Sequence, residues 1–250
     1  MTEIANVSPA ATALIVCKDA RARQLITESL RPLAIRSEIC EEVSAAVRLL
    51  DKQKFEAVIV DLHLGEGAML VMEKLRFSRA NRTAVTFAIA AEDGARTPRI
   101  KLDSTFVLPR PLSADSISQI LRAAYGLVVR ERRRYFRCPL AVPVLVRARQ
   151  PEEEFLGQTV NISEGGIAIS TRTMPDPALS TAVRFSLPGR SSQLFSETRV
   201  RWSGQQGLVG LEFQSLAAPQ KSELQEWLAH KLEETLPENV AALFRSVGQF

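Results

Sequence analysis

The chain has 250 residues, of which 46% are hydrophobic and 24% are charged, a balance typical of soluble globular proteins. Its net charge of +4 is small for this length, which disfavours nucleic acid as a partner because general nucleic-acid binders usually carry a wider basic bias. No apolar run approaches the roughly 20 residues that a membrane-spanning helix needs. The N-terminus has Glu3 and no basic segment, so it does not read as a signal peptide.

Cysteine and histidine are too sparse for a metal site. Cys17, Cys40 and Cys138 are far apart, and His63 and His230 are the only histidines. No spacing suits zinc. We therefore expect no metal site, and we expect the reducing cytoplasm as the compartment.

The first half of the chain alternates between apolar strands and amphipathic helices. The expected strands are 13–17, 35–40, 56–61, 83–90 and 104–111, and the expected helices are 21–30, 43–52, 69–77 and one that follows an N-cap at Ser113. Near-continuous apolar strands separated by helices predict a parallel sheet covered on both faces. Ligands of such sheets bind at the carboxyl ends of the strands.

This order of elements resembles the response-regulator receiver domain over residues 12–126, after a flexible lead-in at 1–11. The resemblance rests on VIVDLHLGEG (58–67) and LPRPL (108–112). In the first motif, Asp61 matches the aspartate that accepts a phosphoryl group in that family.

The positions that would support phosphorylation depart from the family pattern. Where the family has two carboxylates for Mg²⁺, this chain has Cys17 and Lys18, and only the neighbouring Asp19 is acidic. An ammonium group repels a metal ion, whereas Mg²⁺ prefers several oxygen ligands. We hypothesise instead that Lys18 forms an ion pair with Asp61 and keeps it ionised.

Two further family positions differ. The hydroxyl residue after the fourth strand is Ala90 or Ala91, and the lysine before the proline is Arg110. The segment 92–103 is too short and too rich in breakers for a full fourth helix. Phosphorelay through Asp61 is therefore the less favoured alternative, and a receiver-like scaffold is preferred.

The second half changes to the period of strands. Alternating segments at 140–150, 154–163, 166–171, 181–189, 194–204 and 208–214 are separated by turns with Gly or Pro. They predict a small antiparallel barrel. A helix is expected at 219–234, with Leu224, Trp227, Leu228 and Leu232 as its apolar stripe. The tail 237–250 is ambiguous from its sequence, and a short docking helix is one interpretation of it.

An arginine-rich stretch, RERRRYFRCP (130–139), joins the two halves. Taken alone, such a run is usually a solvated, flexible face. NISEGG (161–166) follows about two dozen residues later, and taken alone it fits an ordinary turn.

Together, the motifs RxxxR (133–137) and NxSxxG (161–166), followed by VGLEF (209–213), resemble the PilZ domain family. We assign residues 127–236 to this domain, including the arginine-rich switch segment. The resemblance implies that the chain binds the bacterial second messenger cyclic di-GMP. It also implies a site made of Arg133, Arg137, Asn161, Ser163 and Gly166.

The residue types suit that ligand. A guanidinium fork pairs bidentately with phosphate oxygens and with guanine O6 and N7. Asn161 offers both a donor and an acceptor, Ser163 adds a hydroxyl, and Gly166 lets a backbone approach closely. The sequence leaves open whether Arg199 and Arg201 face the ligand or water.

We therefore expect a cytoplasmic, non-enzymatic receptor for cyclic di-GMP, with no cofactor. The ligand would order the flexible segment 130–137 and change the domain arrangement, with an unidentified downstream protein as the partner. Receiver domains often pair, so the resemblance also allows a homodimer. The alternative is a response regulator phosphorylated on Asp61, with the barrel as its output.

Overall fold

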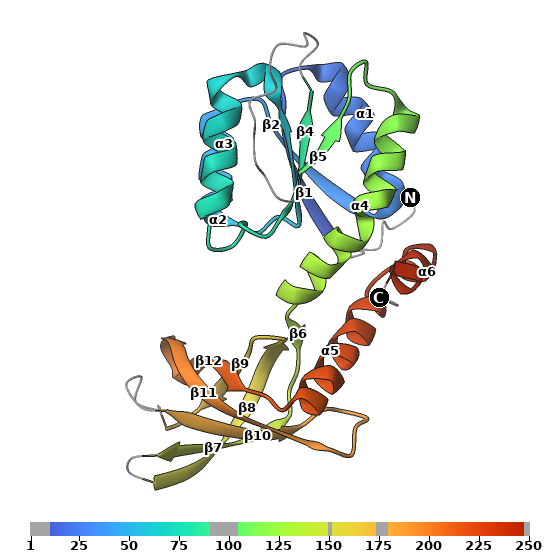
Figure 1. The fold of residues 1–250 in the computed structure, drawn as a ribbon. Coiled ribbons are helices and arrows are strands. Elements are labelled where there is room, and N and C mark those ends of the chain that lie inside the picture. Colours follow the sequence, from blue (N-terminus) through green and yellow to red (C-terminus); the bar gives the residue numbers. More distant parts are fainter. Residues whose placement is uncertain (1–10, 91–104, 150–151, 174–179, 248–250) are drawn as a thin grey trace, which may run out of the picture. The chain divides into compact units, whose positions relative to one another are not determined.

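The structure is a computed structural model that describes residues 11–90, 105–149, 152–173 and 180–247 (Figure 1). Contacts divide the chain into two units, and the second unit is Arg133–Glu234. The first unit contains the residues up to Arg132 and those from Thr235 onward. The expected lead-in, apart from Ala11, and the segment 92–103 lie outside the described residues. Within the described residues, no helix is long and apolar enough to cross a membrane.

The first unit contains a parallel sheet of five described strands in the order β2-β1-β3-β4-β5. The strands are β1 (Ala11–Val16), β2 (Ile35–Cys40), β3 (Ala57–Asp61), β4 (Val85–Ile89) and β5 (Thr105–Leu108). This order is that of flavodoxin-like doubly wound sheets, so the predicted receiver-like fold is confirmed. Every residue of β3 and β4 is buried, as expected for strands covered on both faces.

Four helices accompany this sheet in the described part of the chain. They are α1 (Ala20–Leu30), α2 (Val43–Lys52), α3 (Glu66–Phe77) and α4 (Ala114–Tyr135), and short 3₁₀ turns lie at η1 (Arg31–Leu33) and η2 (Leu62–Leu64). Figure 1 shows α2 and α3 on one face of the sheet and α1 and α4 on the other. Asp61 ends β3 at the carboxyl edge of the sheet, where it is buried.

Helix α4 continues for 22 residues and takes in most of the arginine run. The expectation of a flexible lead-in over residues 130–137 is therefore wrong as far as Tyr135, where the helix ends. The helix persists because Val128, Val129 and Glu131 are buried along one side of it. Arginine also has a high helix propensity, so the exposed side favours the same conformation.

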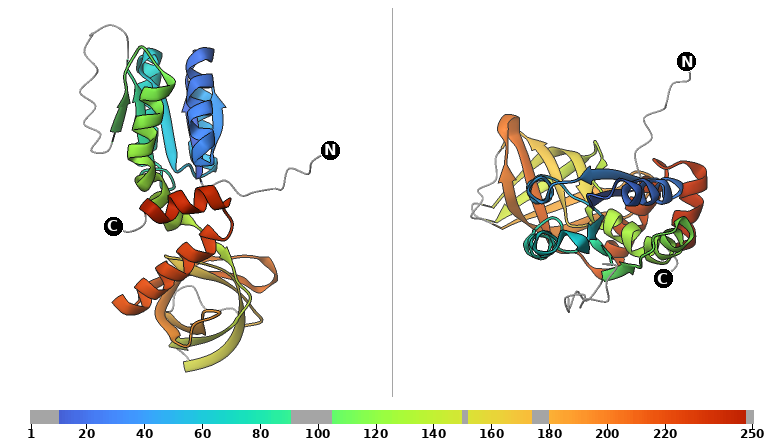
Figure 2. Two further views of the ribbon diagram at one scale, coloured as in Figure 1. Left: turned by 90° about the vertical axis from the view of Figure 1, so that its right-hand side faces the viewer. Right: turned by 90° about the horizontal axis from the view of Figure 1, so that it is seen from above.

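The second unit is an antiparallel barrel. Its strands are β6 (Cys138–Pro139), β7 (Pro143–Arg149), β8 (Glu152–Ser163), β9 (Gly166–Thr171), β10 (Thr181–Ser186), β11 (Gln193–Ser203) and β12 (Leu208–Ser215), with the 3₁₀ turn η3 (Gln205–Gly207) between the last two. Within the described residues, the order β8-β7-β10-β11-β12-β9 closes because β9 also pairs with β8, and β6 adds to one end of β8. The left view of Figure 2 shows these strands as a ring. The predicted barrel is confirmed.

Helix α5 (Ala218–Glu233) packs against the barrel. Its predicted apolar stripe is buried, and the indole N–H of Trp227 donates a hydrogen bond to the carbonyl of Pro188 at 3.1 Å. Beyond it, α6 (Glu238–Val247) lies in the expected tail, and its contacts group it with the first unit. The chain thus enters the second unit at Arg133 and leaves it after Glu234.

Candidate functional site

The end of α4 separates the two arginines of RxxxR. Arg133 lies in the last turn of the helix, where its carbonyl accepts a hydrogen bond from the N–H of Phe136 at 3.2 Å. Phe136 is buried and anchors the chain as it leaves the helix. Arg137 follows the helix and directly precedes β6. The motif therefore spans the step from helix to strand.

The short strand β6 carries RxxxR to NxSxxG. Cys138 lies opposite Ile162, and Pro139 lies opposite Asn161, in an antiparallel register. One further step in this register would set Arg137 opposite Ser163. Tertiary structure thus brings together two motifs that are about two dozen residues apart in the sequence.

Arg133 is held inside the second unit by a carboxylate. One guanidinium nitrogen lies 3.5 Å from Glu233 Oε1, at the end of α5, and only 23% of the Arg133 side chain is exposed. Burial lowers the pKa of Arg133, and the carboxylates of Glu233 and Glu164 act in the opposite direction. The cation therefore sits in a partly dehydrated position beside two acids.

Arg137 has the opposite environment. Its side chain is exposed and forms no hydrogen bond or ion pair with any described residue. Its five N–H donors are consequently available to an anion from outside.

Asn161 and Ser163 lie in the last three residues of strand β8. The side-chain oxygen of Asn161 is buried and has no hydrogen-bond partner among the described residues. A buried acceptor without a partner is costly, so Asn161 is the residue of this motif whose side chain the described fold leaves unsatisfied. The hydroxyl of Ser163 is already used, because it donates to the carbonyl of Gly166 at 3.2 Å.

Gly166 is needed for packing of the barrel. A Cβ at this position would lie 2.3 Å from the carbonyl oxygen of Leu211, because β9 and β12 approach closely here. The neighbouring Gly165 has open space at the same point. Part of the NxSxxG pattern is thus explained by strand packing, a reason that the sequence alone did not reveal.

The VGLEF strand contributes a carboxylate to the surface. Glu212 makes a bidentate ion pair with Arg201, with distances of 2.8 and 2.9 Å, and lies opposite Arg199 in the register of β11 and β12. Hydrogen bonding to Arg201 lowers the pKa of Glu212. The positive charge of Arg201 is therefore already compensated, whereas that of Arg137 is not.

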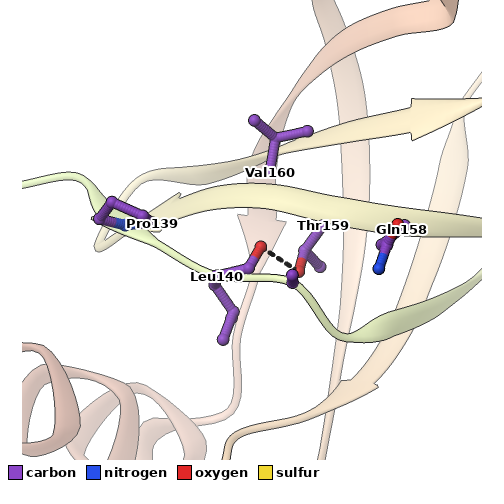
Figure 3. Close-up of a pocket in the computed structure, with 6 residues that line it drawn as sticks. Pro139, Leu140, Gln158, Thr159 and Val160 are labelled. Carbon is purple, nitrogen blue, oxygen red and sulfur yellow. Dashed lines mark hydrogen bonds between the residues drawn. The ribbon is translucent and has the colours of Figure 1, made fainter.

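A hollow of about 450 Å³ lies beside the two motifs, between β8 and the chain that runs through β6 to Ala141 (Figure 3). It is lined by Pro139, Leu140, Ala141, Gln158, Thr159 and Val160. The hydroxyl of Thr159 is turned to the backbone, where it donates to the carbonyl of Leu140 at 2.6 Å. No lining residue is charged, so this hollow does not suit phosphate groups.

In the first unit, Asp61 is buried and is paired with a cation that our hypothesis did not name. The guanidinium of Arg110 lies 3.1 Å from Asp61 Oδ2 and 3.4 Å from Asp19 Oδ2. Lys18 is exposed, so the hypothesis of a Lys18–Asp61 ion pair is wrong. The sequence feature that could have indicated this pair is Arg110, which replaces the lysine of the family. A guanidinium has several N–H donors and can contact Asp61 and Asp19 together.

The remaining donors around Asp61 do not suit Mg²⁺. Cys17 Sγ donates to Asp61 Oδ2 at 3.2 Å, and burial together with this carboxylate raises the pKa of Cys17 to about 12. The thiol is therefore protonated at neutral pH. A thiol and a guanidinium stand where a hard cation needs oxygen ligands, so the residues present do not fit the metal that receiver domains use.

A second buried cluster fixes the end of α4 within the first unit. The carboxylate of Glu131, which is 6% exposed, accepts from Lys54 Nζ and from Thr83 Oγ1. Arg132 lies 3.8 Å from Glu56. Neighbouring residues of the arginine run therefore serve different units, because Glu131 and Arg132 anchor the first and Arg133 belongs to the second.

Comparison with known proteins places the sequence match on the second unit. The model of the PilZ domain family matches residues 131–230. None of the curated proteins that were compared matches the chain. The family match covers the unit that holds both motifs.

Solved structures resemble one unit or the other. The inhibitor of motility MotI/DgrA of Bacillus subtilis is 26% identical over 40% of this chain and 50% of its own, with a TM-score of 0.34. The PilZ domain of CeSA from a cellulose-synthesizing bacterium is 21% identical over 37% of this chain and 94% of its own, with a TM-score of 0.31. The CheY-like receiver domain from Methylobacillus flagellatus is 21% identical over 46% of this chain and 98% of its own, with a TM-score of 0.40. This chain thus spans half the length of the first of these proteins.

Proposed function

Because residues 131–230 form a PilZ domain, we propose that this chain is a non-catalytic receptor for cyclic di-GMP. The proposed site consists of Arg133, Arg137, Asn161, Ser163 and Gly166. The observation that carries the proposal is the pairing of β6 with β8, which joins the RxxxR and NxSxxG motifs in one register.

The chemistry of the site supports an anionic guanine ligand. The exposed guanidinium of Arg137 would pair with a phosphate or with guanine O6 and N7. Asn161 Oδ1 would accept a hydrogen bond from the ligand and so gain the partner that it lacks. Ser163 and Gly166 would fix the conformation of the turn between β8 and β9, because the Ser163 hydroxyl donates to the Gly166 carbonyl.

Calorimetric titration of cyclic di-GMP into the wild type and into Arg137→Ala tests this function. Loss of a bidentate arginine contact should weaken binding by about 1–3 kcal/mol. Arg130→Ala is the matched control, because Arg130 is an exposed arginine of the same run outside the motif. Absence of heat with the wild type would overturn the proposal.

The first unit would then act as a scaffold whose arrangement relative to the barrel responds to the ligand and is read by a downstream protein. Its Asp61 is neutralised by Arg110 instead of being held ready for a metal ion, which argues against phosphorylation as the signal. The three cysteines are free and buried, which fits the reducing cytoplasm that we propose as its compartment.

A further inference from the structure

The ion pair between Arg133 and Glu233 joins two distant points of the chain. Arg133 is the first residue of the second unit, and Glu233 is the last but one. They are 100 residues apart in sequence, yet their side chains lie 3.5 Å apart. Figure 1 shows α5, which ends at Glu233, running beside β6. The pair therefore closes the second unit where the chain enters and leaves it.

Both partners are shielded from water, which strengthens the contact beyond that of a surface pair. Exposure is 23% for the Arg133 side chain and 15% for that of Glu233. A second carboxylate, Glu164, lies close enough to favour the charged form of Arg133, and it is itself held by Gln225 of α5 at 3.1 Å. Arg137, by contrast, meets no such competition from the described residues.

A phosphodiester and a carboxylate can bind to the same guanidinium, since each is a monoanion whose oxygens accept hydrogen bonds from its N–H groups. We propose that Glu233 is a built-in competitor for Arg133, and that cyclic di-GMP displaces it and opens the clasp formed by Arg133 and Glu233. This inference rests on the proposed function. It adds how ligand binding would affect the two points where the chain enters and leaves the second unit.

Displacement of Glu233 would release the end of α5, directly before the chain returns to the first unit at Thr235. Part of the binding free energy is spent on opening the clasp, so the measured affinity lies below the intrinsic affinity of the open form. The closed clasp thus sets both the affinity and the resting arrangement.

Glu233→Gln tests the clasp, because it removes the charge and keeps the size of the side chain. Glu234→Gln is the matched control, since Glu234 is adjacent and pairs with Lys231 at 2.8 Å instead of with Arg133. In calorimetric titrations, Glu233→Gln should bind cyclic di-GMP about three- to tenfold more tightly than the wild type. Glu234→Gln should bind like the wild type.

Small-angle scattering without ligand provides the second measurement. The profile of Glu233→Gln should shift toward that of the ligand-saturated wild type, while the profile of Glu234→Gln should not. If the wild type binds and the two variants agree in affinity and in scattering, the clasp is overturned and the receptor function stands. If the wild type fails to bind, the receptor function falls, and the scattering of ligand-free Glu233→Gln still shows whether this pair holds the resting arrangement.

Discussion

At Asp61, a guanidinium offsets the charge that a metal ion offsets in receiver domains. Arg110 contacts both Asp61 and Asp19, and its Nε also donates to the carbonyl of Ala90 at 3.0 Å. The protonated thiol of Cys17 adds a further donor to Asp61. The hydrogen-bonding needs of the Asp61 carboxylate are therefore met within the fold. Its Oδ2 would have to break these contacts before it could attack the phosphorus of a phosphodonor.

We predict that Asp61 does not form a stable phosphoryl adduct. Incubation with a small-molecule phosphodonor and Mg²⁺ should leave the intact mass of the protein unchanged, because the residues around Asp61 do not suit the metal. A receiver domain of known activity serves as the positive control for the donor. Appearance of an adduct that is lost in Asp61→Asn would restore phosphorelay as the function.

The two adjacent glycines of NISEGG should differ sharply in their tolerance of alanine. Gly166→Ala would bring a Cβ to 2.3 Å from a backbone oxygen of β12, and we expect a loss of about 1–3 kcal/mol in the free energy of unfolding. Gly165→Ala meets open space and should have an effect smaller than about 0.5 kcal/mol. Urea denaturation of the two variants measures the difference, and equal stabilities would contradict the packing role of Gly166.

At the scale of elements, α4 carries Arg133 in its last turn, and Arg137 follows two residues after the end of the helix. Its last turns are held by Glu131, which Lys54 and Thr83 satisfy inside the first unit. A helix of 22 residues that is fixed near its end cannot bend freely at Arg133. The helix ends at Tyr135, and two residues lead from it to β6.

Glu131→Ala should destabilise the protein by about 3 kcal/mol, because it removes the buried carboxylate that accepts from both Lys54 and Thr83. Thermal or urea unfolding measures the change. Arg130→Ala, at the exposed neighbouring position, should change stability by less than about 0.5 kcal/mol. Equal effects of the two substitutions would show that Glu131 does not anchor the helix.

At the scale of the whole molecule, two covalent connections link the units, one before Arg133 and one after Glu234. Both connections are adjacent to residues of the ion pair that we propose the ligand disrupts. In the proposed mechanism, a ligand bound at this place would act on both connections at once, and a small local displacement would then produce a rigid-body change.

Saturation with cyclic di-GMP should therefore change the small-angle scattering profile of the wild-type protein. Arg137→Ala, measured at the same ligand concentration, should show a smaller change in proportion to its weaker binding. Identical profiles of the free and saturated wild type would remove the rearrangement and leave the binding proposal intact.

Local patterns in the sequence were sufficient to predict both folds. Continuous apolar runs predicted the parallel sheet, and alternating apolar and polar residues predicted the barrel. The apolar stripe of α5 identified its packing face. All three patterns depend only on residues that are close together in the sequence. The motifs RxxxR and NxSxxG were visible for the same reason, since each lies within six residues.

Only the tertiary structure decided which charges meet. The pairs Arg110–Asp61, Lys54–Glu131 and Arg133–Glu233 join residues 49, 77 and 100 positions apart, and no local period encodes such contacts. The helical state of residues 130–135 depends in the same way on the buried partners of Glu131. The sequence by itself thus determined the two folds and the arginine motif, while long-range packing determined that Arg110 and Arg133 are engaged in ion pairs and that Arg137 stays exposed.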